Sequence, residues 1–441
     1  MKKMKRVTLL TSLLLATIVT VFAQSGKIEF TEFALDNGLH VILHQDTKTP
    51  IVVVSVMYDV GSKHEKPERT GFAHFFEHLM FEGTKNIGRG EYAKIVERAG
   101  GALNANTAFD RTYYYELLPS NQLELGLWLE SERMLHATVD SIGIQTQKQV
   151  VIEERKQMIE NQPYGTMLLE TLKRAYTEHP YRWHVIGESE HIMAALDEEF
   201  QEFYDTFYVP NNAVLVIAGD IDKDLTKDLV VKYFDGIPRG KKNNSYEKIT
   251  EPPLKGEIRD TIFDNVQLPL ILQAYRAPAM NTADFYAMSM LSTLLSNGES
   301  SRLYRELVDN KQLALLVNSI PLPFNEPSLS VMLALPNMGI APDVLEKKID
   351  EEVEKVKKEL IPETEFQKLK NQFENQIISE NQRMATIAEN LATYHTYFGD
   401  TSYLNEELDR YMAVTREDIQ RVANEYFRPE NRVVLYYMPK K

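Results

Sequence analysis

Apolar and polar positions along this chain of 441 residues follow two kinds of pattern. Short runs of apolar, mostly β-branched residues at 213–217 and 432–437 are typical of buried strands. Longer helical patterns cover 146–172 and 341–360. Because these strands and helices do not alternate strictly as βαβ units, the pattern predicts an α+β fold in which a mixed sheet packs with helices.

The same proline-led strand pattern occurs in both halves of the chain. Pro210 and Pro429 each precede one of the two strand patterns described above. Pro50 and Pro269 are each followed at once by an apolar run, and they are separated by the same interval as the first pair. Two matches at one spacing predict an internal duplication, and hence two homologous domains with α/β-sandwich-like layering. Accidental recurrence of such runs is the alternative.

A polar, proline- and lysine-rich stretch at 236–255 is the best boundary between the two predicted domains. We therefore expect an N-terminal domain at 24–236, a linker at 237–255 and a homologous C-terminal domain at 256–441.

The N-terminus has the order of segments found in a secretory signal peptide. Four of the first six residues are lysine or arginine, and an apolar run spans 7–22. Ala23, which follows this run, suits a cleavage subsite. This order predicts a signal peptide at 1–23 and an exported, periplasmic mature chain. A retained membrane anchor is the alternative reading of the same run.

Composition excludes several kinds of site and partner. The chain has no cysteine, so it has neither disulfides nor thiolate ligands, and any zinc must be held by nitrogen and oxygen. Its formal net charge is −15 at pH 7, which disfavours nucleic acid and anionic membrane surfaces as partners. Stable membrane insertion of the mature chain is not expected.

The strongest chemical signal is His74-Phe75-Phe76-Glu77-His78, which reads H-x-x-E-H. On a helix, residues four apart share one face, so His74 and His78 can bind one metal ion. Glu77 would flank that ion and is placed to take a proton from a water molecule rather than to bind the metal. The alternative is a pair of ordinary surface or core histidines.

A catalytic zinc site usually takes a third protein ligand, and the predicted helix from 146 onward offers Glu153 and Glu154. Glu154 shares its i, i+4 row with Val150 and Met158, whereas Glu153 shares its row with two glutamines. We expect the apolar row to face the core, where a carboxylate needs a partner. Glu154 is therefore the better ligand, and Glu153 either supports the ligands or faces solvent.

The chain resembles the pitrilysin and insulysin family of inverzincin zinc metallopeptidases, in particular the two-domain branch that includes the mitochondrial processing peptidase. The resemblance rests on H-x-x-E-H, on a glutamate at the spacing where Glu154 stands, and on the segment 100–107, which is similar to the family's G-G-x-x-N-A-x-T. It covers nearly the whole mature chain. It implies a clam-shell type assembly and one Zn²⁺ per chain, held by His74, His78 and Glu154.

The resemblance also implies a place for the substrate. In the family the segment similar to 100–107 supplies an edge strand that holds an extended peptide, which here implies substrate binding by Asn104, Ala105, Asn106 and Thr107. From the residues alone, 104–115 is one strand preceded by turn residues, and a structural role is equally open. His179 and His184 also fit the family pattern, and we expect both to be structural.

The second half keeps the scaffold and lacks the ligands. Ser289, Ser292 and Thr293 stand where the duplication places the counterparts of His74, Glu77 and His78. None of the three replacements makes a good zinc site.

The sequence departs from the family pattern at three positions. Gln147 stands where a second glutamate is common, and an amide cannot act as a base or adjust the charge around the ligands. Val308 and Leu315 replace an arginine and a tyrosine that lie in an R-x-x-x-Q-L-G-Y segment of family members able to work alone. Arg302 is nearby, and we expect it to be a packing or helix-terminus residue.

These features together predict a zinc metalloendopeptidase that cleaves peptides or unfolded polypeptide segments, with Glu77 as general base. The missing arginine and tyrosine predict a heterodimer with a homologous subunit that supplies them, and a homodimer remains open. The alternatives are a non-catalytic assembly subunit with a vestigial zinc site and a module that binds peptides without cutting them.

Overall fold

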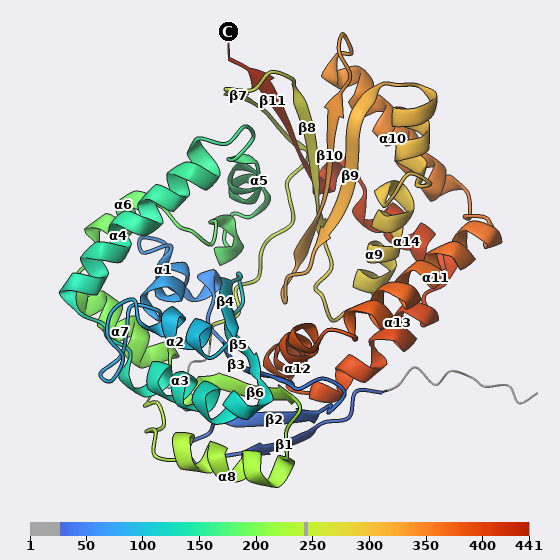
Figure 1. Ribbon diagram of the computed structural model, residues 1–441. Coiled ribbons are helices and arrows are strands. Elements are labelled where there is room, and N and C mark those ends of the chain that lie inside the picture. Colours follow the sequence, from blue (N-terminus) through green and yellow to red (C-terminus); the bar gives the residue numbers. More distant parts are fainter. Residues whose placement is uncertain (1–26, 242–245, 441) are drawn as a thin grey trace, which may run out of the picture.

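The computed structural model describes residues 27–241 and 246–440. The predicted signal peptide at 1–23 lies outside these residues, as does the part of the predicted linker at 242–245. Two sheets, one in each half of the chain, form the centres of two lobes (Figure 1). None of the helices in the described segments combines the length and the apolar character that crossing a membrane requires.

The first sheet has six strands in the order β1-β2-β6-β3-β5-β4. These strands are β1 Thr31–Ala34, β2 His40–Gln45, β3 Ile51–Tyr58, β4 Ala102–Thr107, β5 Thr112–Pro119 and β6 Ala213–Gly219. The α-helices of this half are α1 Phe72–Leu79, α2 Tyr92–Arg98, α3 Leu123–His136, α4 Ser141–Arg155, α5 Met167–Ala175, α6 Ser189–Ala194, α7 Asp197–Phe207 and α8 Lys223–Phe234.

The second sheet has five strands in the order β7-β11-β8-β10-β9. These strands are β7 Ile258–Asp264, β8 Leu270–Ala277, β9 Ala314–Leu322, β10 Ser328–Pro336 and β11 Arg432–Pro439. The α-helices of this half are α9 Ala283–Ser296, α10 Pro342–Lys358, α11 Glu363–Glu380, α12 Met384–Phe398, α13 Glu407–Ala413 and α14 Arg416–Tyr426.

The two sheets share one topology. The order β2-β6-β3-β5-β4 corresponds strand by strand to β7-β11-β8-β10-β9, and each sheet contains one corresponding parallel pair, β6 with β2 and β11 with β7. The residues after the paired prolines also agree, because Asn212 and Asn431 donate to the carbonyls of Phe207 and Tyr426 at 2.9 Å each. The predicted pair of duplicated domains, each a mixed sheet packed with helices, is confirmed.

Both faces of each sheet are covered, which explains the unbroken apolar runs in the sequence. Along β3, Val52, Val54 and Val56 face a core formed with the helices of the first half. Val53 and Met57 face the opposite side. The strand is therefore buried on both faces, and a run of β-branched residues suits such a position.

The second face of each sheet is covered by a helix from the other half. Helix α12, from the second half, packs on β3 and β6 of the first sheet, and its Leu391 is fully buried there. Helix α5, from the first half, packs on β8 and β11 of the second sheet through Leu172 and Ala175. Figure 1 shows both exchanged helices lying against the sheet of the opposite lobe. The predicted domain boundaries stay a prediction. Helices α5 and α12 each pack on the sheet that lies on the other side of the predicted boundary.

Two sequence expectations about elements were wrong. The helix expected at 146–172 is interrupted, because α4 gives way to a π-helical turn at Lys156–Glu160 and α5 begins only at Met167. Pro163 disfavours helical backbone in the residue before it, and Tyr164 has a positive φ of 60°. The strand expected at 104–115 is a hairpin of β4 and β5. The helix expected at 341–360 is present as α10.

Candidate metal centre

Helix α1 presents the H-x-x-E-H residues on its partly exposed face. The opposite face is apolar and buried, and its members are Phe72, Ala73, Phe75, Phe76 and Leu79. Burial of that face fixes the rotation of the helix about its axis. His74, Glu77 and His78 therefore point together away from the core, and each is partly exposed.

The start of α1 is held by a buried carboxylate. Gly71, the residue before the helix, has φ 93°, a conformation that favours glycine. The carboxylate of Glu65 accepts hydrogen bonds from Gly71 N at 2.8 Å and Ala73 N at 2.9 Å, which satisfies two donors of the first turn. The histidine pair is thereby anchored immediately beyond a fixed helix terminus.

Glu154 on α4 completes a set of three possible ligands. His78 Nε2 lies 3.0 Å from Glu154 Oε2, and His74 Nε2 lies 3.7 Å from Glu154 Oε1. The two imidazole rings are nearly perpendicular, at 75°, with centroids 4.9 Å apart. One ligand atom from each residue lies within 4.8 Å of the others. The structure thus brings together the three residues named from the sequence.

Glu154 lies at the site, but the row of α4 that was expected to be buried with it is exposed. Val150 and Met158, expected to share a core-facing row with it, are 43% and 62% exposed. The buried row of α4 instead contains Val151 and Arg155. Glu154 lies at the edge of that row, where it faces the histidines of α1.

The other two residues expected around the ligands behave differently. The Glu153 side chain is 58% exposed and lies 3.6 Å from Lys156, so the structure does not bring it to the histidines. Gln147 Nε2 donates to Glu82 Oε1 at 2.6 Å. Because Glu82 follows α1, this bond joins α4 to the C-terminal end of the helix that carries the histidines.

Burial and neighbouring charges set the protonation of the site. Burial, together with the nearby His78, lowers the pKa of His74 to about 4, so its imidazole is neutral at pH 7. A neutral imidazole is the form that binds metal ions. The hydrogen bond from His78 lowers the pKa of Glu154, which stays ionised. Two imidazole nitrogens and one carboxylate suit zinc.

Glu77 lies beside the three candidate ligands and is bonded to strand β4. Burial raises its pKa, and the hydroxyl of Thr107, which donates to Glu77 Oε2 at 2.5 Å, opposes that rise. Thr107 was expected to bind substrate, and in the structure its side chain holds the carboxylate of Glu77. The sequence carries no signal of this contact, because the two residues come from different elements.

Strand β4 is an outer strand of the first sheet, and among the described residues it pairs with β5 alone. Asn104 Oδ1 accepts a hydrogen bond from Ala105 N at 3.0 Å, so this backbone donor is satisfied by a side chain rather than by a strand. The backbone carbonyl of Asn106 accepts from Arg111 at 3.2 Å, and Arg111 also pairs with Glu389 of α12 at 2.6 Å. No pattern in the sequence singled out Arg111.

The equivalent place in the second half is a cavity to which helix α9 contributes no metal ligand. Ser289, Ser292 and Thr293 on α9 line a cavity of about 530 Å³ next to the outer strand β9. Within the described residues, two groups of side chains could hold a metal ion, and neither includes this cavity. The C-terminal counterpart thus keeps the helix and outer strand without the ligands.

The remaining residues named from the sequence have structural contacts. Val308 packs against the core of the second half, and Leu315 on β9 is 50% exposed. Arg302 makes two hydrogen bonds to Glu365 of α11, at 3.1 and 2.7 Å. His179 is buried and lies 3.1 Å from Glu326, and His184 Nδ1 accepts from Ile186 N at 3.2 Å. His184 lies close enough to His74 to help lower its pKa, whereas the contacts named for the other residues do not reach the three candidate ligands.

Comparison with known proteins identifies the relatives of this chain. The family model described as "Insulinase (Peptidase family M16)" matches residues 40–188, which include H-x-x-E-H and Glu154. The model described as "Peptidase M16 inactive domain" matches residues 197–373. The zinc protease PqqE of Helicobacter pylori is 32% identical over 99% of both chains. A Bacillus subtilis relative named as an uncharacterized zinc protease, YmxG, is 25% identical over 91% of this chain and 97% of its own.

Solved structures show the same fold. A protease from Helicobacter pylori matches with a TM-score of 0.89 and 31% identity, over 93% of this chain and 100% of that chain. The periplasmic protease PqqL of Escherichia coli matches with a TM-score of 0.77 and 18% identity, and there the alignment covers 94% of this chain and 48% of that one. Matching family models over most of the chain, and a relative at 32% identity along its whole length, settle the assignment. The chain belongs to the insulinase family of peptidases, peptidase family M16.

Proposed function

We propose that this chain is a zinc-dependent endopeptidase that cleaves peptides or unfolded polypeptide segments. The observation that carries the proposal is the convergence of His74, His78 and Glu154, with Glu77 beside them. Zinc held by the three ligands would lower the pKa of a water molecule and polarise the carbonyl of the scissile bond. The names of the relatives as zinc proteases support the same chemistry.

Glu77 acts as the general base and then as the general acid. Its carboxylate takes the proton from the attacking water and passes it to the nitrogen of the leaving amine, so the residue is ionised again at the end of the cycle. A pKa raised by burial moves the carboxyl towards neutral pH, where it can both accept and return a proton. The bond from Thr107 holds the carboxylate in place and favours its ionised form.

The substrate peptide lies along β4. An outer strand offers unpaired backbone groups, and an extended peptide can add to it as a further strand. The backbone donor of Ala105, bonded now to the Asn104 side chain, becomes available when that side chain turns away. Because β4 also carries Thr107, a peptide on this edge would pass close to Glu77. Such binding uses the backbone, which suits broad substrate recognition.

Catalysis is completed by a second subunit. Val308 and Leu315 supply no donor for the oxyanion that forms during attack, and losing one such donor typically costs about a hundredfold or more in rate. A homologous subunit that carries an arginine and a tyrosine at these positions would provide them in a heterodimer. A second copy of this chain also carries Val308 and Leu315, so it cannot supply the arginine and the tyrosine. A homodimer would therefore work without these two donors.

Cleavage of a mixed library of quenched fluorescent peptides tests the proposal. The mature chain is assayed alone and with a homologous subunit that carries both donors, and zinc is determined on the same samples. We expect cleavage that is lost with a chelator and with Glu77→Gln, while Glu77→Gln retains zinc. Glu153→Gln is the matched control, since Glu153 is exposed and adjacent to Glu154, and it should retain full activity. Zinc loss in Glu77→Gln would show that Glu77 is a ligand.

A non-catalytic assembly subunit is the second candidate, and the same two positions, Val308 and Leu315, favour it. It predicts that the chain binds zinc and its partner and that Glu77→Gln leaves the activity of the complex unchanged. A fall in that activity to background would exclude this candidate.

We also propose that the chain is exported to the periplasm after removal of residues 1–23. N-terminal sequencing of the protein purified from its native cell envelope should begin at Gln24. An intact N-terminus in a membrane fraction would show a retained anchor.

A further inference from the structure

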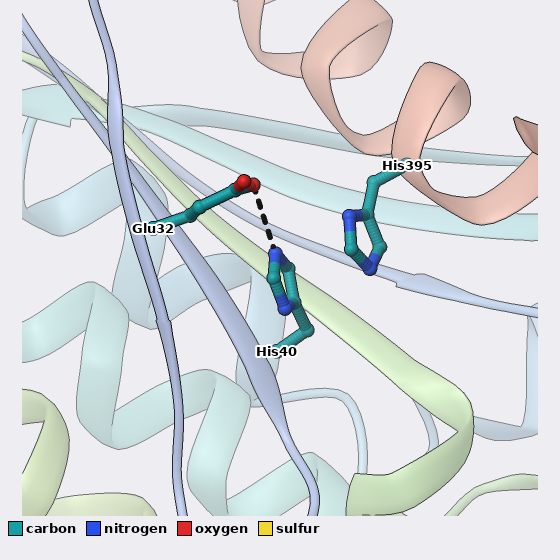
Figure 2. Close-up of side chains that lie close together, drawn as sticks. All are labelled: Glu32, His40 and His395. Atoms are coloured by element: carbon teal, nitrogen blue, oxygen red, sulfur yellow. Dashed lines mark hydrogen bonds and ion pairs between the residues drawn. The ribbon is translucent and has the colours of Figure 1, made fainter. Parts of the chain in front are cut away.

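A second group of metal-binding side chains lies far from α1 and α4 in the fold. It consists of Glu32 on β1, His40 on β2 and His395 on the exchanged helix α12 (Figure 2). Glu32 pairs in register with Ile42, two residues along β2 from His40, so Glu32 and His40 project from the same face of the sheet. Ile42 belongs to the core that α12 covers. The group therefore sits between the first sheet and the helix supplied by the other half.

The three side chains are in direct contact. His40 Nε2 lies 3.1 Å from Glu32 Oε2. The rings of His40 and His395 stack, with centroids 3.5 Å apart and planes 13° from parallel. One ligand atom from each of the three residues lies within 4.8 Å of the others, the same criterion that the candidate catalytic group meets. Figure 2 shows both imidazoles beside the carboxylate of Glu32.

A fourth residue supports this arrangement. The Thr401 hydroxyl donates to Glu32 Oε2 at 2.7 Å and lies 3.2 Å from His395 Nδ1. Hydrogen bonds of this kind orient the ligands of protein metal sites. The side chains of His40 and Glu32 are 22% and 40% exposed, so an ion can reach them from solvent and retain water as a further ligand.

The donor atoms of the group suit a metal ion, because each imidazole offers a ring nitrogen and Glu32 offers a carboxylate oxygen. Two imidazoles and one carboxylate favour transition-metal ions over Mg²⁺ or Ca²⁺, which prefer oxygen ligands. A stack of two imidazoles beside one carboxylate is thus a donor set for an ion such as Zn²⁺.

We propose that Glu32, His40 and His395 form a second binding site for a divalent transition-metal ion, separate from the candidate catalytic centre. The site joins β1 and β2 of the first sheet to α12, so a bound ion ties the exchanged helix to the opposite half. Its role is to stabilise the contact between the halves. The residues of the candidate catalytic centre belong to helices that pack on the other face of this sheet.

Binding requires one local movement. An ion bound by an imidazole nitrogen lies near the plane of that ring, and two stacked rings have no such position in common. One ring must therefore turn about its Cβ–Cγ bond when the ion enters. Both rings are partly exposed, so neither is enclosed by the core.

Zinc binding in a variant that lacks the first set of ligands tests the proposal independently of the proposed function. The full mature chain carrying His74→Ala and His78→Ala is dialysed against Zn²⁺, and bound zinc and the melting temperature are measured. We expect one zinc ion per chain and a melting temperature that rises with zinc. Adding His395→Ala should abolish both effects, whereas adding His136→Ala, which removes a histidine outside either group, should leave them unchanged.

Two further substitutions keep the outcome decisive. Thr401→Val removes the supporting hydroxyl and should weaken zinc binding by about ten- to a hundredfold. If His395→Ala does not fold, His40→Gln is used in its place to remove one ligand of the proposed second site. If the variant lacking His74 and His78 does not fold, His395→Ala is introduced into the otherwise unmodified chain. Bound zinc should then fall from two ions per chain to one. The proposal would be overturned if the folded variant lacking His74 and His78 bound no zinc. It would also be overturned if removal of His395 or His40 from that variant left the amount of bound zinc unchanged.

Discussion

At the residue scale, the hydrogen bond between Thr107 and Glu77 is central to the proposed role of Glu77 as general base. It joins the outer strand of the first sheet to the helix that carries the histidines, and at 2.5 Å it is a short bond to a carboxylate. Because the bond stabilises the ionised form of Glu77, the proposed mechanism depends on it.

Thr107→Val should lower kcat/KM by about tenfold to a hundredfold, since a hydrogen bond to a charged group contributes about 1.5–3 kcal/mol. The acidic limb of the pH–rate profile should move to higher pH, because the pKa of Glu77 rises when the bond is lost. Thr107→Ser restores the hydroxyl and should recover both properties. An unchanged pH profile in Thr107→Val would show that the hydroxyl does not act on the base.

His64 makes stability depend on pH. Burial lowers its pKa to about 3, and its Nδ1 accepts a hydrogen bond from Gly61 N at 3.0 Å. Below its ordinary pKa of 6.5 the unfolded chain binds a proton at His64 that the folded chain does not, so the free energy of unfolding falls as pH drops. The contribution of this one group is about 1.4 kcal/mol per pH unit between pH 6 and pH 4.

His64→Gln should remove that contribution and flatten the dependence of unfolding free energy on pH over this range. Urea denaturation at several pH values measures the slope in both proteins. An equal slope in the two proteins would mean that His64 is protonated in the folded chain.

The three candidate ligands could be named from the sequence, and the structure brings them together, but their surroundings could not be predicted. H-x-x-E-H and Glu154 are recognisable because helix geometry and family spacing constrain them. The bond from Thr107 depends on how a strand passes a helix, which no local pattern records. The prediction that Val150 and Met158 face the core was wrong, because an apolar side chain on a surface helix can remain exposed.

At the element scale, helix α12 is part of the core of the first sheet. Leu391 is fully buried among residues of β2, β3 and β6, although it lies in the second half of the chain. Leu391→Ala should lower the free energy of unfolding by about 2–5 kcal/mol, because it leaves a cavity in that core. Ile378→Ala on α11 is the control, since Ile378 is 41% exposed and its loss should change stability much less.

Denaturant unfolding of the two variants and the unmodified chain measures this difference. Similar stabilities for Leu391→Ala and Ile378→Ala would show that α12 contributes little to the first sheet.

Strands were easier to foresee than helix ends. The β-branched runs at 213–217 and 432–437 are β6 and β11, because strands buried on both faces keep an unbroken apolar pattern. The break between α4 and α5 was missed because the helical period continues on both sides of Pro163. Pro163 and Gly165 were the available signals for that turn.

At the scale of the whole molecule, the exchange of α5 and α12 makes the two halves depend on each other. A chain ending at 236 lacks α12, and the face of the first sheet that carries Val53, Met57 and Val216 would then be exposed. Residues 24–236 alone should therefore be aggregated or partly unfolded, because exposing a large apolar face costs stability and solubility.

Co-expression of 24–236 with 256–441 should restore a soluble complex. Circular dichroism and size-exclusion chromatography of the separate and combined pieces check this expectation. A soluble piece 24–236 with cooperative unfolding would show that the halves fold independently.

The duplication could be predicted from the sequence, but the exchange could not. Pro50, Pro210, Pro269 and Pro429 record the strand repeat in their spacing, and the two sheets share that topology. Which sheet a helix covers depends on the path of the chain through space. No local pattern in the sequence shows that α12 packs on β3 and β6 of the first sheet.

The most direct test of the central claim is a crystal structure of the Glu77→Gln chain loaded with zinc, with anomalous diffraction recorded at the zinc edge. We expect a peak bound by His74 Nε2, His78 Nε2 and the carboxylate of Glu154, at about 2.0–2.2 Å from each. We also expect the amide introduced by the substitution to lie beside the ion without binding it. Absence of zinc between these three residues would contradict the proposed zinc endopeptidase.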